Sequence, residues 1–140
     1  MMWDNVVQAA VALLLADPAL TSALGTDADG IVPIYPAGAS RPVLIPSVEY
    51  FIVLDRYEES LNPILVQWDY WARGMQQATT IERRLRSVLH SETRRQFAGV
   101  DCATLYDDSR DHRHPEPGVI HRSVDIRFEP VRERYVVSGS

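Results

Sequence analysis

The sequence has few of the residues that mark a disulfide-bonded or nucleic-acid-binding protein. Its 140 residues include one cysteine, Cys102, so no internal disulfide can form. Lysine is absent and all fourteen basic residues are arginine. This bias is typical of a GC-rich genome, and arginine also suits planar, bidentate contacts at protein interfaces. The net charge of −5 argues against wrapping nucleic acid, because phosphate binding needs a basic patch.

Long apolar runs are also missing. The longest, residues 9–16, is shorter than the roughly 18 residues that a membrane span needs. Asp4 stands where a signal peptide carries basic residues, so we expect neither a span nor a secretion signal. The seven glycines do not cluster, which excludes a phosphate-binding loop and a dinucleotide fingerprint. We predict no cofactor and no enzymatic activity.

What is present is the hydrophobic pattern of one α+β domain. The length predicts a single domain over residues 1–130, followed by a C-terminal tail over 131–140. Apolar residues at helical spacing predict a helix over 5–16 with Asp4 as its N-cap. Asp17 followed by Pro18 predicts a second, short helix over 18–24.

Alternating apolar residues predict five strands and one further helix. The strands are expected over 31–36, 47–54, 64–72, 97–106 and 120–129, with the first at an edge because of its two prolines. The helix after the third strand begins at Gly74, or at Thr79, where Thr79 and Glu82 match a capping box. Residues 107–118 are expected to form a polar loop.

These elements predict an α+β fold, with a mostly antiparallel sheet of about four to five strands and helices packed on one face. The other face of the sheet carries Phe51, Val53 and Trp71 among polar residues. A half-apolar open face with exposed edges suggests burial against another subunit.

The histidines near the C-terminus are the main candidates for a metal site. Zinc commonly uses residues of the types found here: His112, His114, His121, Asp108 and Asp111. The segment is flanked by Pro115 and Pro117 and has no evident rigid frame, so we predict a solvated loop without structural zinc. The acidic residues do not match a calcium loop, and Cys102 is expected to be a small apolar residue of a strand.

Two polar connections are the candidate contact surfaces, because loops on a rigid sheet commonly carry binding. They span residues 55–62 and 107–118, and plain solvated loops are the alternative for both. The candidate interface residues are Arg56, Glu58, Glu59, Arg110, Asp111, His112 and Arg113. Replacing Arg56 and Arg110 by glutamate is expected to leave the melting temperature nearly unchanged while weakening contacts with partners.

Several short motifs follow one another in order. They are residues 14–20 (Leu-Leu-Ala-Asp-Pro-Ala-Leu), 23–25 (Ala-Leu-Gly), 34–36 (Ile-Tyr-Pro), 45–50 (Ile-Pro-Ser-Val-Glu-Tyr), 66–72 (Val-Gln-Trp-Asp-Tyr-Trp-Ala) and 116–126 (Glu-Pro-Gly-Val-Ile-His-Arg-Ser-Val-Asp-Ile). In this order and spacing, over residues 8–130, the chain resembles the tail-completion or tail-terminator family of long-tailed, siphovirus-type bacteriophages and related gene transfer particles.

The resemblance implies a viral structural protein that is made in the bacterial host cytoplasm and lies at the head-proximal end of the tail. It implies a homohexamer ring that caps the tail tube, stops its growth and offers a docking surface to the DNA-filled head. The implied partners are other copies of the chain, the major tail tube protein and a head-side neck or connector protein, while DNA passes through without specific binding. It implies no catalytic, cofactor or metal residues.

Other assignments remain open. Within the same class, the chain is alternatively a head-side neck or connector component, or another minor tail protein. A small metal-dependent or ligand-binding enzyme is a reading from a different class, as is a host-encoded interaction module.

Overall fold

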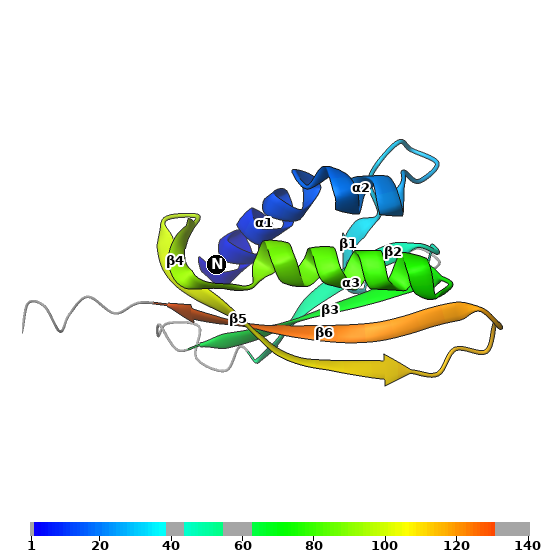
Figure 1. Ribbon diagram of the computed structural model, residues 1–140. Coiled ribbons are helices and arrows are strands. Elements are labelled where there is room, and N and C mark those ends of the chain that lie inside the picture. The colour runs from blue at the N-terminus through cyan, green and yellow to red at the C-terminus, as the bar shows by residue number, and fades with distance from the viewer. Residues whose placement is uncertain (1, 39–43, 55–62, 131–140) are drawn as a thin grey trace, which may run out of the picture.

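The computed structural model describes residues 2–38, 44–54 and 63–130 of the chain. In these residues three helices and six strands follow one another (Figure 1). Their bounds are α1 (Met2–Leu15), α2 (Pro18–Leu24), β1 (Ile34–Pro36), β2 (Ser47–Leu54), β3 (Ile64–Arg73), α3 (Met75–Leu89), β4 (Ser91–Phe97), β5 (Val100–His112) and β6 (Val119–Pro130).

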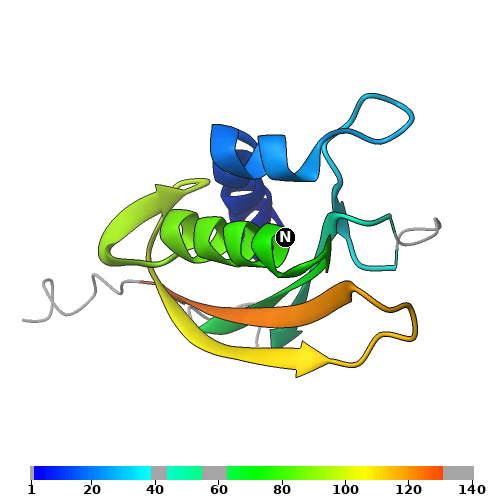
Figure 2. The ribbon, with the colours of Figure 1, turned by 45° about the vertical axis from the view of Figure 1, so that its right-hand side comes forward.

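The strands form one sheet in the order β1-β2-β3-β6-β5-β4. β1 pairs with β2 in parallel, and every other pair is antiparallel. The three helices lie on the same side of this sheet, as two views of the ribbon show (Figures 1 and 2). The predicted α+β fold, with helices on one face of a mostly antiparallel sheet, is confirmed; the sixth strand is β4.

The core fills the space between the helices and the sheet. α3 turns an apolar stripe toward the sheet, in which Ala78, Ile81, Leu85 and Leu89 are all buried. The sheet contributes alternate residues of its central strands: Val66, Trp68, Tyr70, Val124, Ile126 and Phe128. Because side chains alternate between the two faces of a strand, the residues between these point away from the helices.

The short helix α2 begins and ends as the sequence predicts. The Asp17 carboxylate accepts a hydrogen bond from the backbone N–H of Leu20 at 3.0 Å, and Gly25 ends the helix with a positive φ of 69°. Asp17 also pairs with Arg84 of α3, at 2.7 Å between Nη2 and Oδ1, and this contact joins α2 to α3. Among the described residues no single helix is long and apolar enough to cross a membrane; α1 and α2 pass that test only as a pair, bent by 85°.

The predicted start of the first helix is wrong, and of the two starts predicted for the third helix, Gly74 is confirmed and Thr79 is not. α1 begins at Met2, so Asp4 lies in its first turn rather than at its N-cap. α3 begins after Gly74, which has a φ of 88° and no side chain to cap with, so Thr79 lies inside the helix. The side chain of Glu82 accepts a hydrogen bond from the Tyr70 hydroxyl and does not form a capping box.

The region after α3 differs most from prediction. The strand expected over 97–106 corresponds to β5 from Val100 onward, while Phe97 ends a separate strand, β4, because the chain turns back at Ala98 and Gly99, both with positive φ. β4 was not predicted because its residues are nearly all polar, as an edge strand allows. β5 continues to His112, so the predicted loop over 107–118 is wrong for its first half.

Candidate functional site

The face of the sheet turned away from the helices, here called the open face, carries a connected group of polar side chains. No helix or strand in the described part of the chain covers it (Figures 1 and 2). Backbone pairing brings three strands together there: Asp69 of β3 lies beside Ser123 of β6, which lies beside Arg110 of β5. Two residues further along each strand, Trp71, His121 and His112 form a second row on the same face.

A bulge in β5 sets which of its residues reach this face. Tyr106 pairs with Ile126 on the helix-covered face, whereas Asp108 already pairs with Asp125 on the open face. Asp107 is therefore the extra residue, and an extra residue reverses the alternation of every side chain that follows. The bulge turns Arg110 and His112 toward the open face.

The centre of the open face is a hydrogen-bonded cluster around Asp69. Its Oδ1 accepts a hydrogen bond from Gln67 Nε2 at 2.7 Å and another from the Ser123 hydroxyl. His112 Nε2 shares a hydrogen bond with the same hydroxyl. Ser123 is fully buried although no described helix or strand covers this face, because its neighbours' side chains surround it. The cluster is thus held in one arrangement from three strands.

Arg110 extends this cluster to a buried carboxylate. Its guanidinium binds both oxygens of Asp125 and donates to Gln67 Oε1 at 3.0 Å. The Asp125 residue is only 4% exposed. The hydrogen bond to Asp125 raises the pKa of Arg110 above its ordinary value. We therefore expect Arg110→Glu to lower the melting temperature, in contrast to the expectation from the sequence, because the new carboxylate would lie against that of Asp125.

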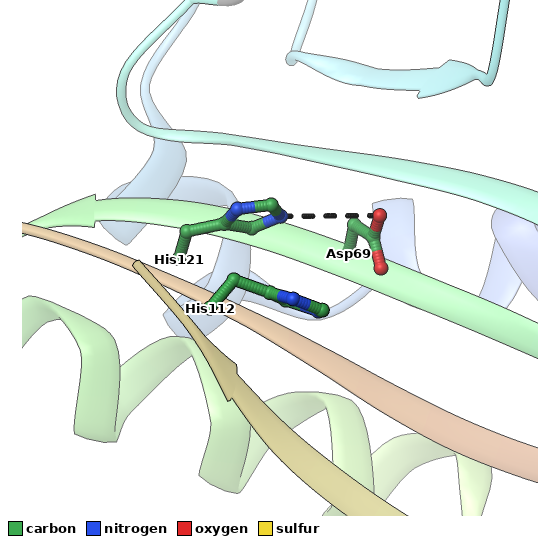
Figure 3. A group of neighbouring side chains, drawn as sticks. All are labelled: Asp69, His112 and His121. Atoms are coloured by element: carbon green, nitrogen blue, oxygen red, sulfur yellow. Dashed lines mark ion pairs between the residues drawn. The ribbon is translucent and has the colours of Figure 1, made fainter. Parts of the chain in front are cut away.

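Three possible metal ligands meet at one end of the cluster (Figure 3). Asp69, His112 and His121 each offer one ligand atom, and these atoms lie within 4.8 Å of one another. His121 Nε2 is 3.9 Å from Asp69 Oδ2, and this buried nitrogen has no hydrogen-bond partner among the described residues. The Trp71 ring stacks on the His121 imidazole with centroids 4.3 Å apart and an interplanar angle of 16°.

The surroundings of this group favour a neutral imidazole. Burial lowers the pKa of His121, and the nearby His112 lowers it further. On the neighbouring strand, burial and the charge of Asp69 raise the pKa of Glu49, which pairs with Asp69 across β2 and β3. Imidazole nitrogens and a carboxylate oxygen within a few ångströms of one another have the chemistry to coordinate a divalent cation.

The predicted interface residues do not form one group. Arg110 and His112 lie on the open face, whereas Asp111 points to the other face, where Arg122 donates to it. Arg113 is exposed in the connection after β5. Arg56, Glu58 and Glu59 lie outside the described residues.

A second polar group lies beneath α3 on the covered face. Glu82 accepts a hydrogen bond from the Tyr70 hydroxyl at 2.7 Å and pairs with Arg122 at 3.3 Å. Burial and the bond to Glu82 raise the pKa of Tyr70. The adjoining hollow, of about 270 Å³, is lined by Thr79, Glu82, Arg83, Arg86 and Arg122. Arg86 and Arg122 already contact carboxylate or aromatic partners, so we interpret the group as a fold-stabilising network.

Cys102 belongs to the core. It is fully buried in β5, and burial raises the pKa of its thiol to about 11. A thiol in this state is protonated at neutral pH and is a poor nucleophile. Its place in a strand agrees with the expected role as a small apolar residue.

Sequence reasoning missed the residues that organise the open face: Gln67, Asp69, Ser123 and Asp125. A signal was present, since polar residues alternate with large apolar ones on both β3 and β6. That pattern predicts an outward-facing polar row. It does not reveal that the two rows are neighbours, because the pairing of β3 with β6 skips β4 and β5.

The fold itself has a known counterpart. The chain shares its fold with a chain of a gene transfer agent virion. The matching structure is described as the virion of a native gene transfer agent particle; the match has a TM-score of 0.63 and covers 88% of this chain and 92% of that one. The sequences are 12% identical, so the likeness shows the fold alone. No family model matches the chain, and no curated protein matches it either.

Proposed function

We propose that this chain is a structural protein of a phage-like particle, the subunit that closes the head-proximal end of the tail tube. The observation that carries the proposal is the likeness to a virion chain over nearly the whole length of both proteins. A partial match could reflect one common supersecondary unit, whereas this one includes helices and sheet together. The order of motifs from residue 14 to residue 126, which resembles the tail-terminator family, supports the same assignment.

The distribution of surfaces fits a subunit that works by recognition. One face of the sheet is covered by helices, while the other presents an ordered polar cluster and the exposed apolar side chain of Phe51, which pairs with Gln67. A closed ring needs two different surfaces on each subunit that meet head to tail. We propose that six copies form such a ring, with one end on the tube and the other facing a neck or connector protein.

The charge balance is compatible with a ring through which DNA passes. A net charge of −5 argues against a general attraction of the chain to the phosphates of DNA. We assign it no catalytic step: its cysteine is buried as a thiol, and stopping a tube requires only that the terminator bind the tube end better than the next tube ring does.

Deletion of the gene in a particle-producing strain tests the proposal. We expect filled heads without tails, together with tubes of abnormal length or with unclosed ends, in electron micrographs. Complementation with the intact gene should restore normal particles. Tails of normal length that lack heads would instead assign the chain to the neck, and infectious particles with normal tails would refute a role in assembly.

The oligomeric state on the particle is a second test. We expect a ring of six copies at the head-proximal tube end in an image reconstruction, although the free chain is expected to remain monomeric when the tube end acts as the template. A stable closed dimer as the only functional form would contradict the ring, because a two-fold interface uses one surface twice and leaves no second surface for ring closure.

A further inference from the structure

We propose that Asp69, His112 and His121 form a binding site for a divalent transition-metal ion of the zinc type. The site goes beyond the proposed role in particle assembly, and it reverses the expectation of no zinc that the sequence supports. That expectation rested on placing His112 and His114 in a loop over residues 107–118, and the structure places His112 on β5, paired with His121 of β6.

The frame of the site is rigid. His112 and His121 lie directly opposite each other on β5 and β6, and Asp69 comes from β3 on the other side of β6. Three adjacent strands of one sheet therefore present the ligands from fixed backbone positions (Figure 3). The Trp71 ring against His121 fixes the orientation of that imidazole. His114, the remaining histidine of the C-terminal region, is not part of the group.

The distances require only a small closure. Ligand atoms around a tetrahedral zinc ion lie about 3.3 Å apart, given zinc–ligand bonds of about 2.0–2.1 Å. The three ligand atoms here lie within 4.8 Å of one another, and the His121 Nε2 to Asp69 Oδ2 distance is 3.9 Å. His112 is exposed, so its side chain can turn from the Ser123 hydroxyl toward a bound ion.

One ligand atom makes no hydrogen bond in the described structure. His121 Nε2 is buried without a hydrogen-bond partner, and a buried polar atom in that state is costly unless something binds it. Asp69 has the opposite arrangement: Gln67 and Ser123 donate to Oδ1 and leave Oδ2 directed at His121. Hydrogen bonds of this kind orient a metal-binding carboxylate and make its free oxygen available.

The donor set selects the kind of metal. Two imidazoles with one carboxylate suit zinc and its neighbours among the transition metals, whereas magnesium and calcium prefer sites made of oxygen alone. The open face leaves the remaining coordination position to water. The ion would link β3, β6 and β5 across the open face.

Titration of the untagged, full-length chain with Zn²⁺ tests the site, with Mg²⁺ as the comparison ion. We expect one Zn²⁺ per chain by calorimetry, a higher melting temperature with zinc, and no comparable effect of Mg²⁺. Co²⁺ should bind at the same stoichiometry and give the visible absorption of a four-coordinate site.

Variants separate this ligand set from a general affinity of histidines for zinc. Asp69→Asn, His112→Gln and His121→Gln should each weaken Zn²⁺ binding at least about tenfold, while His114→Gln should bind like the unmodified chain. Melting curves without zinc check that each variant folds, and the exposed His112 gives a variant least coupled to folding. Binding that is absent in the unmodified chain, unchanged in His112→Gln, or lost in His114→Gln as strongly as in Asp69→Asn would overturn the proposal.

Discussion

The same strands present different kinds of side chain on the two faces of the sheet. Along β3, Trp68 and Tyr70 are buried under α3, while Gln67 and Asp69 between them belong to the polar cluster of the open face. Along β6, Val124 and Ile126 face the core, while Ser123 and Asp125 face away from it. The covered face stabilises the fold through apolar packing, and the open face holds polar groups in a fixed geometry.

The difference between the faces separates stability from binding. Burial of polar groups is unfavourable unless they are hydrogen-bonded, and Ser123 and Asp125 are buried on the open face although no described element covers it. An arrangement of this kind presents an ordered surface to whatever meets it, in keeping with assembly and with metal binding. Substitutions on the two faces should therefore have effects of different size and kind.

The largest loss of stability is expected on the covered face. Trp68 is fully buried between α3 and the sheet, and replacing a buried aromatic side chain by alanine leaves a cavity. We expect Trp68→Ala to lower the free energy of unfolding by about 3–5 kcal/mol, measured by chemical denaturation. In the proposed role this variant should reduce particle assembly toward the level of a deletion, because less of the chain would be folded. A loss below about 1 kcal/mol would mean that the core does not depend on this side chain.

A smaller loss is expected where the open face holds a buried carboxylate. The Arg110 and Asp125 side chains are 40% and 6% exposed, so Arg110→Gln leaves a nearly buried charge without its main partner. We expect a loss of about 1–3 kcal/mol in the same denaturation experiment.

Arg127 provides the matched control for Arg110. Its side chain is 41% exposed, close to the value for Arg110, but its partners Asp107 and Glu129 are themselves 43% and 39% exposed. Arg127→Gln should therefore cost between about 0 and 1 kcal/mol. Equal effects of the two changes would show that the burial of Asp125 is not what makes Arg110 important.

On the helix side, Asp17 should give a pH-dependent effect. The hydrogen bond from Arg84 lowers the pKa of Asp17 in the folded chain. A carboxyl group whose pKa is lowered by folding stabilises the fold above its unfolded pKa of about 3.9, and this contribution is lost as the pH falls through the folded value. Asp17→Ala should cost about 1 kcal/mol at neutral pH, and less in acid.

Asp17→Ser separates the contribution of the helix cap to stability from that of the ion pair with Arg84. Serine retains an oxygen for the backbone N–H of Leu20 but cannot pair with Arg84. Its stability relative to the unmodified chain should therefore fall at neutral pH and recover as the pH is lowered below about 4. A difference that does not change with pH would show that the ion pair with Arg84 contributes nothing to stability.

The elements that the sequence predicts best are those whose pattern comes from the covered face. Both β2 and α2 have the predicted bounds, 47–54 and 18–24. These elements contact the core directly, so their hydrophobic period is clear. β4 has no such period, because six of its seven residues, Ser91 to Gln96, are polar and the strand lies at the sheet edge.

The open face could be predicted only in part. The outward direction of Gln67 and Asp69 follows from alternation, but the position of His112 depends on the bulge at Asp107 and on the continuation of β5. The meeting of Asp69 with His121 depends on strand order, which periodicity does not specify. Local pattern thus predicts the layers, whereas the cluster results from long-range pairing.

The smallest effect on stability, with a clear effect on assembly, is expected at the exposed apolar residues of β2. Phe51 and Val53 are 37% and 42% exposed, and Phe51 pairs with Gln67 of the open face. Replacing both by serine should change the free energy of unfolding by less than about 0.5 kcal/mol. If this face meets a neighbouring subunit, the double variant should nevertheless yield fewer complete particles. Met75→Ser is the control, because Met75 is 55% exposed at the start of α3, on the helix side. Normal particle yield from the double variant, or an equal loss from Met75→Ser, would show that the exposed apolar residues of β2 are not part of the assembly surface.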